Sequence, residues 1–313
     1  MSLIPLVAVV GPTASGKTRL AVDIALKYRG EVVSADAMQI YRKMDIGTAK
    51  PSAEEMRGVA HHMIDIVEPT DFFSVAQYVE SAKDCITGIH SRGALPILSG
   101  GTGLYVSSLV DNIRFGETVR DEGLRLRLGK IAAEQGGEVL LDILRGFDPK
   151  TAAMLHPNNI GRIIRAIEVF ETTGATMSEM QKKSRQTPQL YNLCMIGLNF
   201  ENRDVLYRRI DARVDEMLKS GLVQEVDRLL KAGATNKSTS MQAIGYKEIA
   251  AALRGEISME TAVDNVKRET RRYAKRQLTW FRRDERINWI EASYNNEKIC
   301  QNAFKIIDKC LFV

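Results

Sequence analysis

Residues 11–18 read Gly-Pro-Thr-Ala-Ser-Gly-Lys-Thr and lie between an apolar run and a segment with helical spacing. The apolar run from Leu6 to Val10 predicts a buried strand, and the segment from Arg19 to Lys27 predicts a helix. A strand, a glycine-rich turn and a helix start, in this order, are the context that a phosphate-binding loop requires. The chain is therefore predicted to contain an α/β unit built around a phosphate site.

The residue types in this loop each have a physical role. Gly11 and Gly16 allow positive φ angles and the close approach of an anion, so that backbone N–H groups can point at phosphate oxygens. Lys17 adds a positive charge for the terminal phosphates, and the Thr18 hydroxyl suits a Mg²⁺ ion that bridges them. The loop does not decide whether the bound phosphate is attacked or leaves. The candidate diphosphate-binding residues are Gly11, Pro12, Thr13, Ala14, Ser15, Gly16, Lys17 and Thr18.

The composition is that of an ordinary globular protein. Of 313 residues, 44% are hydrophobic and 27% are charged, which is the usual range. No apolar run approaches the roughly eighteen residues of a membrane span, and the N-terminus lacks a secretory pattern, so we expect a cytoplasmic location and no membrane partner. The four cysteines lack metal-ligand spacing and are interpreted as buried thiols. His61 and His62 likewise lack a partner at metal spacing and are interpreted as structural or phosphate-facing.

Two further strands are predicted to end beside the phosphate loop. Residues 31–36, Glu-Val-Val-Ser-Ala-Asp, predict a strand that ends in the Asp36 carboxylate, and Leu95 to Leu98 predict another. The latter leads into a second glycine-rich turn, Gly100 to Gly103, which carries Thr102. Because the carboxyl ends of parallel strands face the ligand crevice, Asp36 and the second turn are expected to flank the phosphate site. Tight packing of a helix on a strand is the alternative role for these glycines.

The rest of the chain divides into a helical part and a return to the sheet. From about residue 121 strand-like runs disappear, and Arg162 and Arg165 share one helix face. We predict an α/β fold class, a P-loop NTPase-like parallel sheet with flanking helices and an all-helical insertion domain. Residues 1–120 are expected to form the first part of the core, 121–190 the helical insertion, with a polar edge suited to binding, and 191–313 the return to the core with basic C-terminal helices. Further expected elements are strands at Met63–Ile66, Leu193–Phe200 and Ile287–Ile290, and helices at Ser74–His90, Leu124–Glu134, Val139–Leu144, Ile160–Thr172, Met177–Lys183, Arg203–Lys231 and Glu297–Cys310.

A basic segment lies between Lys267 and Arg283, where eight residues are basic and Glu269 is the single acid. Lys267, Arg271 and Lys275 step by four, and the residues one position later do the same, so that they form one strip on a helix. A solvated face usually alternates in charge sign, and this one does not. We therefore expect a polyanion partner, with RNA favoured over a membrane. A structural surface is the alternative.

Five segments carry a resemblance to a known family: residues 11–18, Ser34 to Tyr41, Asp45 to Pro51, Gly100 to Tyr105 and Gln242 to Lys247. Together they resemble the tRNA dimethylallyltransferases, the bacterial isopentenyl-tRNA transferase family. The resemblance runs in order along almost the whole chain. Several segments are specific to the family, whereas the phosphate loop is shared with many ATP-binding and other nucleotide-binding proteins.

The resemblance implies transfer of a dimethylallyl group from dimethylallyl diphosphate to the N6 amine of adenosine 37, 3′ of the anticodon in tRNA. It implies that the loop and Mg²⁺ hold the diphosphate, with Thr18 at the metal and Arg213 assisting. Asp36 is implied as the general base and Thr102 as a contact to the target nucleotide. The expected partners are the tRNA anticodon stem-loop and the donor, and the expected state is a monomer. The implied tRNA-binding residues are Asp36, Ala37, Met38, Gln39, Thr102, Arg125, Gly161, Arg162, Arg165, Gln242, Gly245, Tyr246 and Lys247, to which the basic strip adds Arg271 and Lys275.

The sequence departs from the family in two places, and other functions stay open. Ala37 stands where the family commonly has Ser, and the segment Gly161 to Arg165 matches only in its two arginines. An adenylate isopentenyltransferase, which acts on a free nucleotide, would need neither the helical insertion nor the basic strip. A P-loop kinase of a small molecule would turn over ATP. An RNA-binding NTPase switch would need an Asp after the strand near Leu98, where Ser99 and two glycines stand.

Overall fold

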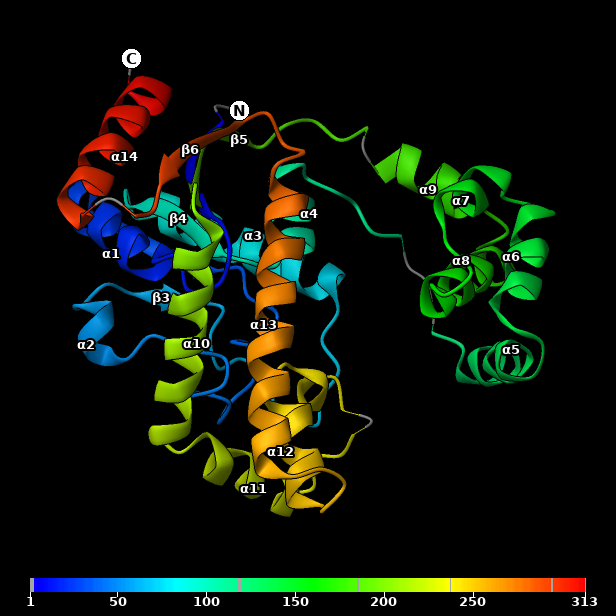
Figure 1. Cartoon of the computed structure of the whole chain (residues 1–313). Coiled ribbons are helices and arrows are strands. Elements are labelled where there is room, and N and C mark those ends of the chain that lie inside the picture. The colour runs from blue at the N-terminus through cyan, green and yellow to red at the C-terminus, as the bar shows by residue number, and fades with distance from the viewer. Residues whose placement is uncertain (1–2, 117–119, 185, 237, 294, 313) are drawn as a thin grey trace. The chain divides into compact units, whose positions relative to one another are not determined.

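The computed structural model describes residues 3–116, 120–184, 186–236, 238–293 and 295–312 (Figure 1). The chain divides into two compact units, residues 1–110 together with 190–313, and residues 111–189. The second unit interrupts the first, because the chain leaves the sheet unit after α4 (Gly103–Val110) and returns to it at β5 (Tyr191–Asn199). The sequence pattern starts the insertion later, at 121, because residues 113–116 form neither helix nor strand.

Six parallel strands form the sheet of the first unit, which confirms the predicted α/β class with a parallel sheet. Their order is β3-β2-β4-β1-β5-β6, and each neighbouring pair is parallel. β1 lies between β4 and β5, so the phosphate-binding loop that follows β1 leaves the sheet away from its edges. The strands are β1 Ile4–Val10, β2 Gly30–Ser34, β3 His61–His62, β4 Leu95–Gly100, β5 Tyr191–Asn199 and β6 Ile287–Glu291.

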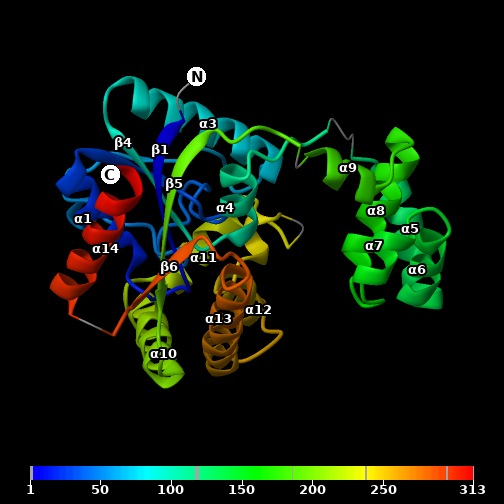
Figure 2. The same cartoon turned by 90° about the horizontal axis from the view of Figure 1, so that it is seen from above.

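Helices cover both faces of this sheet (Figure 2). Val7 and Val9 of β1 join one core with α1 and α14, whereas Leu6 and Val10 join the opposite core with α3 and α4. Successive side chains of a strand point to opposite faces, so a strand covered on both sides reads as an unbroken apolar run. The covering helices are α1 Lys17–Tyr28, α3 Val75–Ser91, α4 Gly103–Val110 and α14 Asn296–Leu311.

A third core of the first unit forms around Ile40, Met44 and Tyr246. The prediction of one continuous helix over Arg203–Lys231 is wrong. Two helices occur there, and Gly221, with φ 100°, lies between them. The positive φ of glycine at such a position lets the chain change direction at little cost. The elements of this region are α2 Ala53–Met56, α10 Arg203–Lys219, α11 Leu222–Lys231, η1 Ser240–Gln242, α12 Tyr246–Leu253 and α13 Met259–Phe281.

The short strand predicted at Met63–Ile66 is also wrong. The strand is His61–His62, and positive φ angles at Met63 and Asp65 turn the chain directly after it. Met63, Ile64 and Ile66 therefore belong to a turn that packs against the sheet, and they do not form a strand of that sheet. Among the described residues, no helix combines the length and the apolar character that crossing a membrane requires.

The second unit, residues 111–189, is helical. Leu140, Leu144, Ile163 and Ile167 are buried in its core, and its helices are amphipathic enough to leave charged side chains outside. The short helix α7 was not predicted, because its sequence of Pro, Lys, Thr and small residues has no apolar period. The helices are α5 Glu122–Gln135, α6 Gly137–Arg145, α7 Pro149–Met154, α8 Ile160–Thr173 and α9 Met177–Ser184.

Candidate active site

A pocket of the first unit opens at the carboxyl ends of β1, β2 and β4. Lys17, Thr18 and Asp36 line it together, so the predicted phosphate loop and the predicted carboxylate share one cavity. Arg213 of α10 and Gln39 also line it, as the sequence analysis expects of site residues. Further walls come from elements distant in sequence, among them Thr48, Ala49, His61, Gly101, Tyr273 and Gln277.

The phosphate-binding loop owes its shape to glycine. Gly11 has φ 142° and Gly16 has φ 94°, and a Cβ on Gly11 would lie 2.6 Å from the carbonyl oxygen of Leu198. Gly16 is the N-cap of α1 and provides no side-chain cap, so the first N–H groups of α1 have no capping side chain. The buried Ser15 hydroxyl likewise lacks a hydrogen-bond partner. The loop thus presents donors where an anion at a helix N-terminus would lie.

The Lys17 ammonium lies inside this loop. Its Nζ donates a hydrogen bond to the carbonyl oxygen of Pro12 at 2.7 Å. Burial and the nearby positive charge of Arg213 lower the pKa of Lys17 to about 7, although Asp36 acts in the opposite direction. Because a bound anion favours the charged form of a neighbouring amine, the charge of Lys17 is coupled to the occupancy of the pocket.

Arg209 and Arg213 lie one turn apart on α10, and both interact with residues of the glycine-rich loop. Burial lowers the pKa of Arg213, and the carboxylates of Glu55 and Asp36 oppose that shift. Arg209 Nε donates to the carbonyl oxygen of Ala14 at 2.9 Å, which holds the loop from the side of α10. The sequence analysis missed Arg209, although its spacing of four residues from Arg213 could have indicated a shared helix face.

Asp36 and Thr102 are neighbours across the two strand ends. One Asp36 carboxylate oxygen accepts a hydrogen bond from the backbone N–H of Met38 at 2.9 Å. The Thr102 hydroxyl accepts one from the N–H of Ala37 at 3.0 Å, so the second glycine-rich turn holds the residue next to Asp36. A Cβ on Gly100 would lie 2.2 Å from the Ala35 carbonyl oxygen. Glycine is therefore required there for the two strand ends to approach this closely.

Helix α13 supplies two pocket residues that the sequence analysis did not assign to the site. The buried Gln277 accepts a hydrogen bond from the N–H of Thr13 at 2.8 Å and donates one to the carbonyl oxygen of Gly101 at 2.9 Å. Tyr273 lines the pocket, and burial raises its pKa, a shift that the Thr102 and Gln277 side chains oppose. Both are less exposed than the basic residues beside them, and the strong basic pattern of this segment draws attention away from them in the sequence.

In the second unit, two of the predicted tRNA-binding arginines are paired with a buried acid. Arg125 contacts both carboxylate oxygens of Glu168 at 2.7 and 2.8 Å, and Arg165 contacts it at 2.5 Å. The Glu168 side chain is fully buried, and its hydrogen bonds with these arginines hold its pKa at about 2. Arg125 and Arg165 thus have a structural role, whereas Gly161 and Arg162 are exposed; contact of the four with tRNA stays a prediction.

The predicted tRNA-binding segment Gln242 to Lys247 is exposed only in part. Gln242 and Lys247 are exposed, and Gly245 has φ 95° as the N-cap of α12. Tyr246 is fully buried, and its hydroxyl donates to Glu225 at 2.6 Å. The Tyr246 side chain therefore presents no surface to RNA in this structure, and the geometry does not support its predicted contact.

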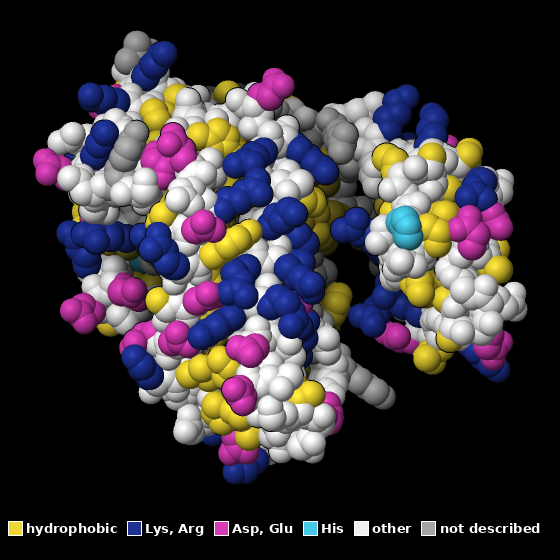
Figure 3. All heavy atoms as spheres, viewed as in Figure 1, with side chains coloured by type: hydrophobic (Ala, Val, Ile, Leu, Met, Phe, Trp, Pro, Cys, Tyr) yellow, Lys and Arg dark blue, Asp and Glu magenta, His cyan; other side chains and the backbone are white. Residues whose placement is uncertain are grey.

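The basic strip of α13 has acidic neighbours that the helix's own sequence does not contain. Lys267 pairs with Asp215 at 2.5 Å and Arg271 with Asp211 at 2.7 Å, both acids of α10. Two of the six strip residues, Lys267 and Arg271, therefore join α13 to α10. Lys275 lies further along and is exposed. Figure 3 shows Lys and Arg side chains gathered over α13 on this face.

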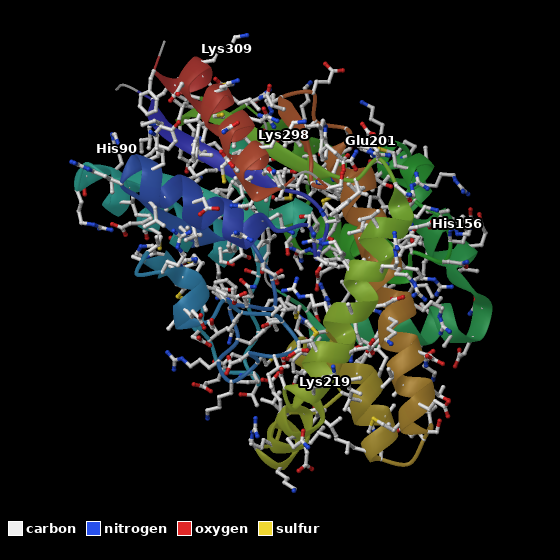
Figure 4. All side chains as sticks on the ribbon, turned by 60° about the vertical axis from the view of Figure 1, so that its left-hand side comes forward. His90, His156, Glu201, Lys219, Lys298 and Lys309 are labelled. Atoms are coloured by element: carbon white, nitrogen blue, oxygen red, sulfur yellow. The ribbon has the colours of Figure 1, made fainter. Side chains whose placement is uncertain are left out.

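Histidines do not form a metal site here. His90 lies in the last turn of α3, and His156 precedes α8 in the second unit (Figure 4). His61 lines the pocket, and its Nδ1 lies 2.9 Å from the Val59 carbonyl oxygen. Within the ranges that the structure describes, no three His, Cys, Asp or Glu side chains gather as metal ligands would. Mg²⁺ needs no such cluster, because it commonly binds one or two protein oxygens together with phosphate oxygens and water.

These features define an α/β protein whose pocket combines a glycine-rich loop of the kind that binds phosphate with two basic residues, Lys17 and Arg213, and a carboxylate, Asp36. The family model described as IPP transferase matches residues 39–284. The tRNA dimethylallyltransferase of Caldanaerobacter subterraneus subsp. tengcongensis is 51% identical over 97% of this chain and 98% of that protein. The chain belongs to the IPP transferase family, the tRNA dimethylallyltransferases, and is a prenyltransferase.

Other relatives and solved structures agree. The tRNA dimethylallyltransferase of Halalkalibacterium halodurans is 50% identical over 91% of this chain and 90% of that protein. The crystal structure of the tRNA isopentenylpyrophosphate transferase from Bacillus halodurans matches with a TM-score of 0.73 and 46% identity, covering 98% of this chain and 96% of that one. A eukaryotic dimethylallyltransferase acting on tRNA matches with a TM-score of 0.79 and 27% identity, covering 96% of this chain and 79% of that one.

Proposed function

We propose that this protein transfers a dimethylallyl group from dimethylallyl diphosphate to the N6 amine of adenosine 37 in tRNA, 3′ of the anticodon. The observation that carries the proposal is that Lys17, Thr18 and Asp36 line one pocket in a chain of this family. Lys17 and the loop N–H groups suit a diphosphate, and Asp36 suits the acceptance of a proton. A phosphate site without such a carboxylate would support donor binding alone.

In the proposed reaction the N6 lone pair attacks the allylic carbon of the donor. The carbon–oxygen bond breaks, and its electron pair leaves with diphosphate. The proton of the amine passes to an Asp36 carboxylate oxygen, which the hydrogen bond from Met38 N–H holds in place. An exocyclic adenine amine is barely basic, so the carboxylate receives the proton as the carbon–nitrogen bond forms.

Lys17, Arg213 and the N–H groups of residues 11–18 stabilise the charge that grows on the leaving diphosphate. Arg213 is half-buried near Asp36 and Lys17, in surroundings where charge interactions are stronger than in water. Thr18 and Asp36 are oxygen donors in the same pocket, which fits Mg²⁺. The ion, when bound, would neutralise diphosphate charge and improve the leaving group.

The acceptor base must leave its stack to reach a pocket at the carboxyl ends of the strands, so we propose that adenosine 37 flips out of the anticodon loop. Thr102 lies beside Asp36 and Gln39 lines the pocket, which supports their contact with that nucleotide. Exposed basic residues such as Lys275 would hold the RNA backbone. As an enzyme of tRNA modification it would work in the cytoplasm, and as a monomer.

The direct test incubates the protein with Mg²⁺, radiolabelled dimethylallyl diphosphate and either unmodified tRNA or AMP. Label at the adenosine next to the anticodon is the expected result. Label in AMP alone would overturn the tRNA acceptor and favour a free-nucleotide prenyltransferase. No label in either acceptor, with phosphate transfer from ATP to a small molecule, would overturn prenyl transfer itself.

A further inference from the structure

Glu225 of α11 holds a loop by its backbone. Its two carboxylate oxygens accept hydrogen bonds from the N–H groups of Asp45, Ile46 and Gly47, at 2.9 to 3.1 Å. The Tyr246 hydroxyl donates a further one at 2.6 Å. Glu225 is 2% exposed, and a buried carboxylate requires such donors because it has lost its water. The backbone N–H groups of residues 45–47 are therefore held by one side chain that lies 178 or more positions away in sequence.

The packing around this carboxylate leaves the loop little freedom. A Cβ on Gly47 would lie 2.4 Å from the Tyr246 ring, so the loop rests directly on that ring. The other end of the loop is held by Lys50, whose Nζ donates to the carbonyl oxygen of Tyr41 at 2.6 Å and to Asp45 at 2.7 Å. Only 6% of the Lys50 side chain is exposed. The Glu225 carboxylate and the Lys50 ammonium, two buried charges of opposite sign, thus hold the loop of residues 45–50 in place.

The residues after Gly47 form a wall of the substrate pocket. Thr48, Ala49 and Pro51 line it. The Gln39 amide donates to the carbonyl oxygens of Thr48 at 3.3 Å and of Ala49 at 3.2 Å, and its own oxygen accepts from the Ser34 hydroxyl at 2.9 Å. The loop carbonyls therefore decide which way the Gln39 amide points into the pocket.

We propose that Glu225 is a positioning residue for the transfer reaction: by fixing residues 45–47 it sets the pocket wall at 48–51 and the direction of the Gln39 amide. This inference rests on the proposed function. It also gives the Gly245-Tyr246 pair a role inside the protein, because Tyr246 buttresses both the carboxylate and Gly47. In the part of the chain that the structure describes, the phosphate loop shares no hydrogen bond with residues 45–51 and is held instead by Arg209 and Gln277, so diphosphate binding is expected to be independent of Glu225.

The test uses Glu225→Gln. An amide keeps the size of the side chain but offers one acceptor oxygen instead of two, and its NH₂ group faces backbone N–H groups. We expect faster hydrogen exchange of the amides of residues 45–47 and a fall in kcat/KM for tRNA of about 10- to 100-fold, as small misplacements at a reacting centre produce. Binding of inorganic diphosphate should stay within about twofold, since the loop's own anchors remain.

Three further variants make the result specific. Asp227→Asn makes the same charge change at an exposed position of α11 and should behave as the wild type. Glu225→Asp keeps the charge and should recover part of the lost rate. Tyr246→Phe keeps the Glu225 carboxylate and the aromatic ring, so it should loosen residues 45–47 less than Glu225→Gln does. If Glu225→Gln does not fold, the same measurements are made on Tyr246→Phe instead.

Unchanged exchange at residues 45–47 in Glu225→Gln would overturn the proposal, and so would faster exchange with an unchanged transfer rate. A parallel loss of diphosphate binding would show a general loss of structure and would likewise contradict it. If the wild type labels no tRNA, the proposed function fails, and the exchange measurement still decides whether Glu225 holds the pocket wall.

Discussion

Gln277 accepts a hydrogen bond from the backbone N–H of Thr13 at 2.8 Å, which ties α13 to the phosphate-binding loop. The same amide donates to the carbonyl oxygen of Gly101 at 2.9 Å, so one buried side chain joins the two glycine-rich turns of the pocket. Removing it would leave two backbone groups without this partner, and a buried unpaired group costs about 1–3 kcal/mol.

Gln277→Leu is therefore expected to lower kcat/KM for prenyl transfer by roughly 10- to 100-fold, because both turns lose their common anchor. Steady-state transfer of labelled donor to tRNA measures it. Gln301→Leu, at an exposed position of α14, is the matched control and should leave the rate unchanged. Wild-type kinetics in Gln277→Leu would mean that the turns hold their geometry without α13.

Asp36→Asn is expected to slow single-turnover transfer by about 10²- to 10⁴-fold while tRNA affinity stays within a few-fold, because a general base contributes to the rate and little to binding. Rapid quench of the labelled product measures the rate, and filter binding measures the affinity. Asp142→Asn, an exposed change in the second unit, is the control. Undiminished turnover would remove Asp36 from the proton transfer.

Lys17 should make diphosphate binding depend on pH. Its pKa is lowered to about 7 by burial, and a bound anion raises it again, so above pH 7 binding must take up a proton. The affinity for inorganic diphosphate should therefore fall as the pH rises above 7, by up to roughly tenfold per pH unit. Calorimetry in buffers of different ionisation enthalpy counts the proton. Lys17→Met removes the proton that Lys17 takes up on binding, so the uptake that remains reports the ionisation of diphosphate itself. Equal proton uptake in the two proteins would contradict the role of Lys17 in the pH dependence.

Glu168 should make the second unit sensitive to acid. Its pKa is lowered from 4.5 to about 2, so its contribution to stability is complete above pH 4.5 and is lost as the pH falls toward 2. Since one pKa unit corresponds to about 1.4 kcal/mol, the loss is about 3 kcal/mol. Hydrogen exchange of α8 peptides across this range measures it. Glu168→Gln should expose α8 already at neutral pH, and Glu171→Gln, on the exposed side of α8, should not.

Substitutions of Lys275 and Arg271 distinguish a role in RNA binding from a role in stability. Lys275→Ala should weaken tRNA binding and reduce its salt slope by about 1, as the loss of one phosphate contact does, with no change in melting temperature. Arg271→Ala leaves Asp211 of α10 without its partner at 2.7 Å and should lower the melting temperature. An unchanged salt slope in Lys275→Ala would mean that this part of α13 is a solvated face.

The sequence predicted the centre of the site because that chemistry is local. A phosphate loop is one contiguous turn between a strand and a helix, and Asp36 and Thr102 each follow a buried strand within a few residues. Parallel strands bring such ends together whatever the rest of the chain does. The same locality explains why most of the long helices and strands were predicted. Two predictions fail at Gly221 and at Met63 and Asp65, where a positive φ overrides the apolar period, and the short helices α2 and α7 were missed.

Only the tertiary structure decided which charged groups face a ligand and which face the protein. The acids that pair with Lys267 and Arg271 lie on α10, so a strip that is basic in its own segment is partly neutralised by a neighbouring helix. In the same way, the acid that pairs with Arg125 of α5 lies on α8. Gln277 and Glu225 reach backbone groups of loops 264 and 178 positions away. Neither periodicity nor spacing encodes such a hydrogen bond, because its two partners meet only when the separate elements have packed.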